Sequence, residues 1–418
     1  MTIRLGAALG CTSERESGFA RKNYYSPDAP RSYQISMYDR PLCTGGSLEF
    51  EDGEESVQIA LERIHLEDDA GKLLHGHGGH SLIDFNRCGM PLAEIVTMPV
   101  IHSPRHASLY LQKLRQMLRY LGICDGNLEE GSMRVDVNIS LRRKDDETLG
   151  TRTEIKNLNS FKAVEAGLEH EIGRQRIELE RGGTITQVTN LWDARKKKLV
   201  KMRTKEGAHD YRYFPEPDLP VLAVDEEWAG VERSKIPEMP LERERRFRRE
   251  YGLSAYDAGV LTAERDIADY YEETARLTGE PKTTANWVMR DVLRELKASD
   301  GGIGDFPVGP AALAGLIDLV NGGAVATTAG AEVFNAMLES GENAADALKR
   351  LGLERISGED ELEGIVDRVI ESHPGELERY RGGKKQLMKF FVGQVMKESG
   401  GKADPVIAGD ILKRKLDG

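Results

Sequence analysis

The sequence has 418 residues, 39% of them hydrophobic and 31% charged, and a formal net charge of −12. This length predicts two or three domains, and the acidic balance argues against a general nucleic-acid coat while leaving room for a local basic surface. No apolar stretch is long enough to span a membrane, and four widely spaced cysteines without a C-x-x-C pair are typical of reduced thiols in a cytoplasmic protein.

Strand patterns separated by glycine-containing turns fill the first half of the chain. In residues 56–61, SVQIAL, apolar and polar side chains alternate, which is typical of a half-buried strand. Residues 133–142 alternate over a longer run, and residues 151–157 alternate again after a polar turn. We expect the two segments to form an antiparallel hairpin. Its polar face would then collect Asp136, Asn138, Glu154 and Lys156.

A helix is predicted directly after this hairpin. Ser160 is a suitable N-cap, apolar residues recur at four-residue spacing from Val164, and a glycine pair at 182–183 ends the pattern. Residues 209–220, HDYRYFPEPDLP, end in prolines and are expected to form an ordered loop.

Beyond about residue 235 the pattern is helical almost throughout. We therefore predict an α+β fold with three parts. A mixed α/β domain with antiparallel strands covers residues 1–235, an all-α domain covers 236–345, and a small helical tail domain covers 346–418. From Glu378 to Gly418 there are ten Lys or Arg against five Asp or Glu. This local excess suits an anionic partner, although a basic helical face in solvent is an equally good interpretation.

Residues 61–72, LERIHLEDDAGK, place Glu67, Asp68 and Asp69 in a row, with Lys72 behind a glycine. Three adjacent carboxylates repel one another unless water, a cation or a partner compensates them. By itself the run favours a solvated turn over a cation site. A similar choice applies to HGHGGH at 75–80, where a flexible hairpin tip is favoured over metal ligation.

Several enzyme signatures are missing from the sequence: the G-x-x-x-x-G-K-[ST] phosphate loop, G-x-G-x-x-G, H-E-x-x-H and G-x-S-x-G. What remains is a high density of carboxylates near amide and basic groups on the predicted strands. Oxygen-rich sites of this kind suit Mg²⁺, which keeps waters or substrate phosphates as its other ligands. Basic residues such as Lys72, Arg152 and Lys156 could then neutralise phosphate charge.

Seven segments, in order along essentially the whole chain, closely resemble the family of B subunits of the aspartyl/glutamyl-tRNA amidotransferase. They are RKNYYSPDAPRSYQIS (21–36), RIHLEDDAGK (63–72), LEEGSMRVDVNIS (128–140), GTRTEIKNLNSF (150–161), HDYRYFPEPDLP (209–220), ANWVMRDVL (285–293) and FFVGQVMK (390–397). The resemblance implies a cradle-like catalytic domain, a helical domain and a small YqeY-like tail domain that engages tRNA.

The implied reaction amidates Glu misacylated to tRNA-Gln, or Asp misacylated to tRNA-Asn. ATP with Mg²⁺ would phosphorylate the side-chain carboxylate, and ammonia from an amidase subunit would displace the phosphate. A small third subunit would complete a heterotrimer. The basic tail agrees with a tRNA partner, and no membrane partner is expected.

Site residues follow from the same resemblance. It implies metal ligands at Asp68, Glu94, Asp136 and Glu154, catalytic roles for Glu67, Asp68, Glu94 and Lys156, and nucleotide contacts from Lys72, Asn138, Arg152 and Asn157. Asp136 and Glu154 could instead be a cross-strand polar pair on a wet sheet face. Glu94 stands among apolar residues in PLAEIVTMPV, where we expect it to be buried. Tyr211, Arg212 and Tyr213 could contact nucleotide or the tRNA acceptor end, or pack on their own domain.

The sequence also departs from the family pattern. A leading G-L-E-V-H strand is not found, S-E-P-D after Glu94 reads Thr97-Met98-Pro99-Val100, Q-E-T-R reads Gln187-Val188-Thr189-Asn190, and Asp68 replaces a glutamate. A missing leading segment would reflect a truncated gene model or a mis-set start codon. Two hypotheses follow. The chain is either an active transamidating subunit with an altered site, or a degenerate paralogue that binds tRNA or the amidase with little chemistry.

Overall fold

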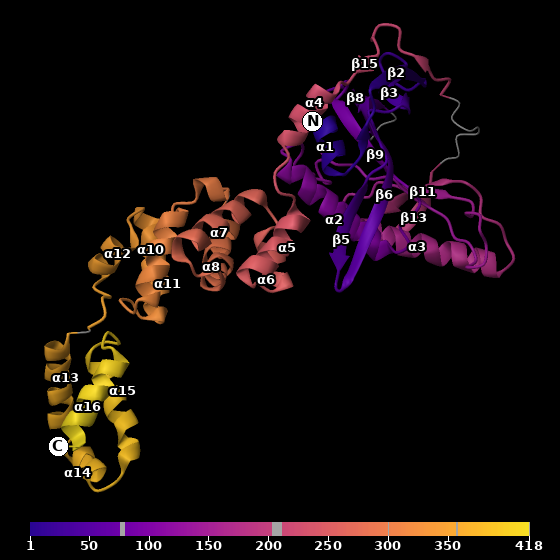
Figure 1. Ribbon diagram of the computed structural model, residues 1–418. Helices are drawn as coiled ribbons and strands as arrows, with labels where there is room; N and C mark the ends of the chain where they lie inside the picture. The colour runs from indigo at the N-terminus through magenta and orange to yellow at the C-terminus, as the bar shows by residue number, and fades with distance from the viewer. Residues whose placement is uncertain (76–79, 203–210, 300, 357, 418) are drawn as a thin grey trace. The chain divides into compact units, whose positions relative to one another are not determined.

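The computed structural model describes residues 1–75, 80–202, 211–299, 301–356 and 358–417 (Figure 1). The chain forms two compact units, Met1–Arg243 and Glu244–Gly418. The first combines sheets and helices, and in the second the regular elements are helices, which confirms the α+β prediction. The finer division at residues 235 and 345 stays a prediction. None of the described helices is long and apolar enough to cross a membrane.

The main sheet of the first unit is built around the long strand β6, Glu55–Asp68. It pairs antiparallel with β3, β4, β5 and β9. The other strands of this sheet extend it outward from β3 and β4. Its members besides β6 are β1 (Thr12–Ser13), β2 (Glu16–Asn23), β3 (Tyr33–Arg40), β4 (Cys43–Thr44), β5 (Ser47–Asp52), β9 (Pro91–Thr97), β14 (Phe214–Pro215) and β15 (Leu222–Ala223).

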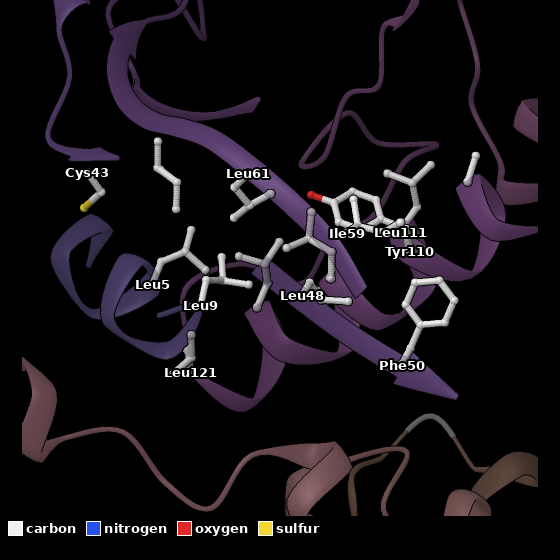
Figure 2. Close-up of a cluster of buried hydrophobic side chains, with 14 of the residues drawn as sticks. Leu5, Leu9, Cys43, Leu48, Phe50, Ile59, Leu61, Tyr110, Leu111 and Leu121 are labelled. Atoms are coloured by element: carbon white, nitrogen blue, oxygen red, sulfur yellow. The ribbon is translucent and has the colours of Figure 1, made fainter. Parts of the chain in front are cut away.

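The strand predicted at 56–61 is confirmed, and its apolar side chains face the core of the first unit. Leu48 on β5 lies opposite Ile59 on β6, and both are buried. Figure 2 shows these side chains with Leu5 of α1 (Thr2–Ala8) and Tyr110 of α2 (Pro104–Tyr120) around them. Fully burying one such side chain contributes about 1.5–3 kcal/mol, so this layer fixes which face of β6 is buried as far as Leu61, where the register shifts.

A second, four-stranded sheet has the order β10-β11-β12-β13. Its strands are β10 (Val137–Ile139), β11 (Thr153–Lys156), β12 (Thr189–Asp193) and β13 (Lys198–Lys201). The predicted hairpin is confirmed, because β10 and β11 pair antiparallel with Asn138 opposite Glu154. The strands are shorter than the alternating runs. A separate two-stranded ribbon is formed by β7 (Lys72–His75) and β8 (Ser81–Asp84).

Helix α3, Phe161–Glu180, begins and ends where the sequence predicts. The Ser160 side chain accepts a hydrogen bond from the Ala163 N–H at 3.1 Å, and Gly182 has φ of +76° just after the helix. Helix α4 follows at Glu226–Ser234. The segment 209–220 is less irregular than expected, since Phe214–Pro215 form β14 against β2. Residues 209 and 210 of that segment lie outside the described part.

A buried polar network joins α3 to the hairpin. The Thr153 hydroxyl donates to Glu171 Oε1 at 2.7 Å and accepts from Gln175 Nε2 at 2.9 Å. Gln175 Oε1 accepts from the Leu141 N–H at 3.0 Å, and Arg174 forms an ion pair with Glu171 at 2.6 Å. Buried polar groups need such partners, so the network holds β11 against α3.

The second unit consists of short helices around two separate buried clusters. The first cluster extends from Phe247 to Leu348, and the second from Leu362 to Leu416. The helices are α5 (Pro240–Tyr251), α6 (Ala255–Leu261), α7 (Arg265–Thr278), α8 (Pro281–Trp287), α9 (Leu293–Ala298), α10 (Pro310–Asn321), α11 (Thr327–Ser340), α12 (Ala344–Leu351), α13 (Glu359–Ser372), α14 (Pro374–Arg381), α15 (Met388–Glu398) and α16 (Pro405–Asp417). A π-helical turn, Val288–Val292, joins α8 to α9, and 3₁₀ turns cover Ile303–Asp305 and Lys385–Leu387.

The Thr153 network generates a stability prediction. Thr153→Val keeps the side-chain volume but removes the hydroxyl shared by Glu171 and Gln175. We expect the free energy of unfolding of the first unit to fall by about 1–3 kcal/mol, because the buried Gln175 donor and the buried Glu171 acceptor each lose one of their hydrogen bonds. Urea denaturation monitored by fluorescence measures it, with the exposed Thr186→Val as the matched control. Equal midpoints for the two variants would contradict the role of the network.

Glu171 also generates a pH dependence. Burial raises its pKa, but hydrogen bonds from Arg174, Gln175 and Thr153 outweigh burial and hold the pKa below 4.5. The stabilisation is therefore complete above about pH 4.5 and is lost as the pH falls through the lowered folded-state pKa. The stability difference between wild type and Glu171→Gln should shrink between pH 6 and pH 3 in urea titrations. The exposed Glu180→Gln on the same helix should show no such convergence.

Candidate active site

The acidic run at the end of β6 is not a solvated turn, because β6 continues through Asp68. Asp68 Oδ1 accepts a 2.7 Å hydrogen bond from the Ile35 N–H, and Oδ2 forms an ion pair with Arg31. Asp69 is only 3% exposed. Arg134 binds it through both guanidinium ends, with Nη1 to Oδ1 at 2.9 Å, and Arg87 Nε lies 3.2 Å from Oδ2. Two of the three carboxylates are therefore compensated by arginines.

Glu67 points to a different set of partners. It lies two residues beyond His65 on β6, so both side chains share one face of the strand. His65 stands directly opposite Glu94 of β9. His65 Nε2 is 3.5 Å from Glu67 Oε1 and 3.6 Å from Glu94 Oε2. One ligand atom from each of the three residues lies within 4.8 Å of the other two.

The three side chains differ in their access to solvent. His65 is 1% exposed, whereas half of the Glu94 side chain is exposed. The expectation of a buried Glu94 is therefore wrong, because the apolar neighbours in its segment do not cover its carboxylate. The group thus has a dry inner end and an outer end open to water or a ligand.

Neighbouring strands stabilise the charge on Glu67. Ser36 of β3 donates to Glu67 Oε1 at 2.8 Å, and Lys22 Nζ of β2 lies 3.9 Å from the same oxygen. Burial raises the pKa of Glu67, but the interactions with His65, Lys22 and Ser36 outweigh burial and lower the pKa below its ordinary value. Glu67 is therefore an anion at neutral pH.

An aromatic group stands beside these acids. Tyr213 stacks on Tyr38 of β3 with ring centroids 5.1 Å apart, and Tyr211 meets Tyr213 edge-on at 5.9 Å. Burial raises the pKa of Tyr213, and the negative charges of Glu67 and Glu94 raise it further. The tyrosines therefore pack on their own unit and also border the acidic group.

The hairpin residues form a second group. Lys156 Nζ lies 2.6 Å from Asp136 Oδ2 and 3.1 Å from Glu154 Oε1, while Glu154 Oε2 accepts from the Thr189 hydroxyl at 2.7 Å. Burial lowers the pKa of Lys156, but the bonds with Asp136 and Glu154 outweigh burial and raise it. The polar face predicted for Asp136, Asn138, Glu154 and Lys156 is thus present, with the lysine between the two acids.

The other predicted residues stand apart from these contacts. Lys72 begins β7 and lies at least partly open to solvent, and Arg152 precedes β11 and is exposed. Asn157 adopts φ of +65° and donates from Nδ2 to the Trp192 carbonyl at 3.0 Å, so its amide fixes a turn after β11. In the HGHGGH segment, residues 76–79 lie outside the described part of the chain.

The two groups come from different sheets, but one ion pair relates them. Arg134, which binds Asp69 at the end of β6, occupies the same alternating face as Asp136 and Asn138.

The sequence predictions missed His65, Ser36, Lys22 and Tyr38. The only sequence signal was the His-x-Glu spacing at 65–67, whose meaning depends on the pairing of β6 with β9.

A cavity of about 730 Å³ lies elsewhere in the first unit, between α1, β1 and α4. Cys11, Arg15 and Asp225 are among its lining residues, and burial raises the pKa of the Cys11 thiol to about 11. Of the described residues that line it, none is a predicted site residue. The predicted site residues therefore lie away from the lining of this cavity.

The donor set agrees with the implied cation. Glu67 and Glu94 offer carboxylate oxygens beside an imidazole, and Asp136 and Glu154 offer more beside Lys156. Carboxylates of this kind suit Mg²⁺. Asp68 fits less well, because both of its oxygens already have partners.

Comparison with known proteins gives two family matches. Residues 1–230 match the GatB/GatE catalytic domain, and residues 269–416 match the GatB domain. The B subunit of the aspartyl/glutamyl-tRNA(Asn/Gln) amidotransferase from Chlorobium phaeobacteroides is 51% identical over 416 residues, covering 100% of this chain and 88% of the relative. The proteins of the same name from Pelodictyon phaeoclathratiforme and Trichlorobacter lovleyi are 49% and 46% identical over 416 residues, with the same coverage.

These matches extend over more than half of the chain and confirm the resemblance found in the seven sequence segments. The chain belongs to the GatB/GatE family, as a homologue of the amidotransferase B subunits.

Proposed function

We propose that this chain is the transamidating subunit of a glutamine-dependent tRNA amidotransferase and acts on Glu-tRNA(Gln), Asp-tRNA(Asn) or both. The observation that carries the proposal is the pair of charged groups at the strand ends: Glu67 with Glu94, and Lys156 between Asp136 and Glu154. Such a site suits a reaction in which a carboxylate is activated by phosphorylation and then attacked by ammonia.

In this proposal Mg²⁺-bound ATP supplies the phosphoryl group and screens its negative charge. Glu94, half exposed, and Asp136 and Glu154, beside Lys156, would hold the cation. Lys156 stays protonated at neutral pH and would balance negative charge that develops on the transferred group. Asp68 could become a ligand only if its ion pair with Arg31 opened.

The remaining predicted residues take supporting roles. Lys72 and Arg152 are solvent-accessible cations that could meet phosphates as the substrate binds. Asn138 faces the same side as Asp136, where its amide could bind nucleotide. Asn157 would act by holding the turn that follows Lys156, through its bond to the Trp192 carbonyl.

The partners in this proposal are an amidase subunit, a small third subunit and the misacylated tRNA. The relatives' names describe one subunit of an amidotransferase for aspartyl- or glutamyl-tRNA, and the basic C-terminal segment offers a surface for phosphates. Part of that surface is neutralised locally, because Lys415 pairs with Asp367, Arg414 with Glu359 and Lys385 with Asp417. The other basic residues of the segment would carry the tRNA contact.

The degenerate-paralogue hypothesis is not favoured. The three relatives compared above, which align with the whole chain, are named as the amidotransferase subunit. The two acids that are replaced after Glu94 also lie beyond the end of β9. Met98, which replaces the first of them, follows the end of β9, and its N–H donates to the Ala60 carbonyl at 2.9 Å. Four residues of extended chain span about 13 Å, so the replacement at Met98 does not remove a ligand from directly beside Glu94.

An amidation assay tests the proposal directly. The chain is co-expressed with its amidase and small subunits, and amidation of Glu-tRNA(Gln) is measured with ATP, Mg²⁺ and either glutamine or ammonium. We expect Glu94→Gln and Lys156→Ala to lower the rate by about a hundredfold or more with both nitrogen donors. Glu94→Gln removes a proposed ligand of the cation, and Lys156→Ala removes the positive charge that would balance the transferred group. Glu55→Gln, at the exposed far end of β6, is the matched control and should keep wild-type activity.

Two results would decide against the proposal. One is the absence of product with either nitrogen donor from a soluble wild-type complex that still binds tRNA. The other is wild-type activity in both site variants.

A further inference from the structure

We propose that Arg63 binds the side-chain carboxylate of the aminoacyl-tRNA before that carboxylate is phosphorylated. Its guanidinium would exchange a neighbouring carboxylate, that of Glu62, for the carboxylate of the substrate. Arg63 belongs to neither the cation-binding group nor the phosphate-binding group described above. The inference deepens the proposed function and rests on it for the identity of the ligand.

An irregularity in β6 places Arg63 at the site. The pairing of β6 with β9 shifts register between Leu61 and Arg63, and Arg63 then stands opposite Val96. Without the shift, Arg63 would share the core-facing side of Leu61, because side chains two residues apart on a strand point the same way. The shift turns Arg63 to the face that carries His65 and Glu67. β-Bulges often redirect a side chain next to a functional site, and this one brings a guanidinium to the acids.

The guanidinium of Arg63 lies on an aromatic surface beside the acids. Its central carbon is 4.8 Å from the centroid of the Tyr38 ring, and Tyr38 stacks on Tyr213, whose hydroxyl is influenced by the charges of Glu67 and Glu94. The Arg63 side chain is 16% exposed, and its Nε is buried without a hydrogen-bond partner among the described residues. Buried donors usually have an acceptor. This side chain therefore has hydrogen-bonding capacity that the described part of the chain does not use.

The ion pair that Arg63 makes within the chain can be exchanged easily. Arg63 Nη1 pairs with the preceding residue, Glu62, and half of the Glu62 side chain is exposed. Exposed ion pairs contribute little to stability, because water competes for both partners. Turning the guanidinium on the Tyr38 ring breaks no hydrogen bond of Nε, since that atom has none among the described residues. A substrate carboxylate can then be bound through two parallel N–H donors, which fix its orientation as well as its charge.

The position of Arg63 along β6 favours the carboxylate over the phosphates of ATP as its ligand. Lys156, which would balance charge on the transferred group, belongs to the second sheet. Arg134 joins the segment leading into that sheet to Asp69, just beyond the last residue of β6. Five residues of strand, about 17 Å, separate Arg63 from Asp68 at that end. The nucleotide and the aminoacyl group would thus reach the acids from opposite sides, with Arg63 on the aminoacyl side.

Binding of tRNA analogues tests the inference without turnover. The complex of this chain with its amidase and small subunits is titrated, without ATP, with tRNA(Gln) that carries glutamate or glutamine through a stable amide link. The two ligands differ only at the side-chain carboxylate. We expect the wild-type complex to bind the glutamyl form about tenfold more tightly, because a bidentate pair with a charged group is strong. Arg63→Gln should reduce this preference to about twofold or less and leave the affinity for the glutaminyl form unchanged.

Three further variants separate binding of the carboxylate from effects on folding. Tyr38→Leu, at a side chain that is itself exposed, removes the aromatic surface under the guanidinium and should also lower the preference. Glu62→Gln removes the competing carboxylate and should raise it. Arg105→Gln changes a surface arginine on α2 that pairs with Asp52. It is the matched control and should keep the wild-type preference.

Equal affinity of the wild-type complex for the two forms, or an undiminished preference in Arg63→Gln, would overturn the inference. An equal loss of affinity for both forms in Arg63→Gln would also overturn it, because the effect would then be general. If Arg63→Gln does not assemble, a wild-type preference in both Tyr38→Leu and Glu62→Gln overturns it instead. The amidation assay decides the proposed function separately, since an inactive wild-type complex that still prefers the glutamyl form counts against amidation and not against the role of Arg63.

Discussion

The pairing of β6 with its neighbours is the constraint on which the first unit depends. This strand of fourteen residues pairs with β3, β4, β5 and β9. Its first half carries Val57, Ile59 and Leu61 into the hydrophobic core. Its last residues carry the acids. A register shift between Leu61 and Arg63 interrupts the alternation, so that Ile64 returns to the hydrophobic core. His65 and Glu67 therefore point to the other face of the strand.

The acids at the end of β6 have different partners. This distinguishes carboxylates that are fixed by arginines from a carboxylate that can bind a ligand. Asp69 is held by Arg134 and Arg87, and Asp68 by Arg31 and a backbone N–H. Buried carboxylates fixed by arginines have little freedom to bind anything else. Glu67 has weaker partners, namely the Ser36 hydroxyl, the Gln34 amide at 3.3 Å and a lysine at 3.9 Å. Among the described residues no arginine fixes it, so it can still bind a ligand.

The same ion pairs relate the two sheets of the first unit. Arg134 belongs to the alternating segment that leads into β10, and it binds the carboxylate that ends the acidic run. The Thr153, Glu171 and Gln175 network holds β11 against α3 from the other side. The positions of Asp136 and Lys156 therefore depend on buried polar contacts, which are more directional than apolar packing.

Local sequence determined much of this protein. Alternation predicted the first half of β6 and the β10–β11 hairpin, Ser160 and the glycine pair predicted the ends of α3, and seven segments identified the family. Each of these signals rests on residues close together in the chain, where strand and helix periodicity and capping operate. The grouping of Asp136, Glu154 and Lys156 could be predicted because the hairpin is local.

Only the tertiary structure decided which of the acids can bind a ligand. The sequence favoured Asp68 as a metal ligand, whereas Asp68 forms an ion pair with Arg31. The sequence also favoured a buried Glu94, whereas half of its side chain is exposed. The role of His65 depends on its register with Glu94, about thirty residues away in the chain, and the solvent exposure of each carboxylate depends on which strands and arginines surround it. Those contacts are set by the packing of distant segments, which no local periodicity encodes.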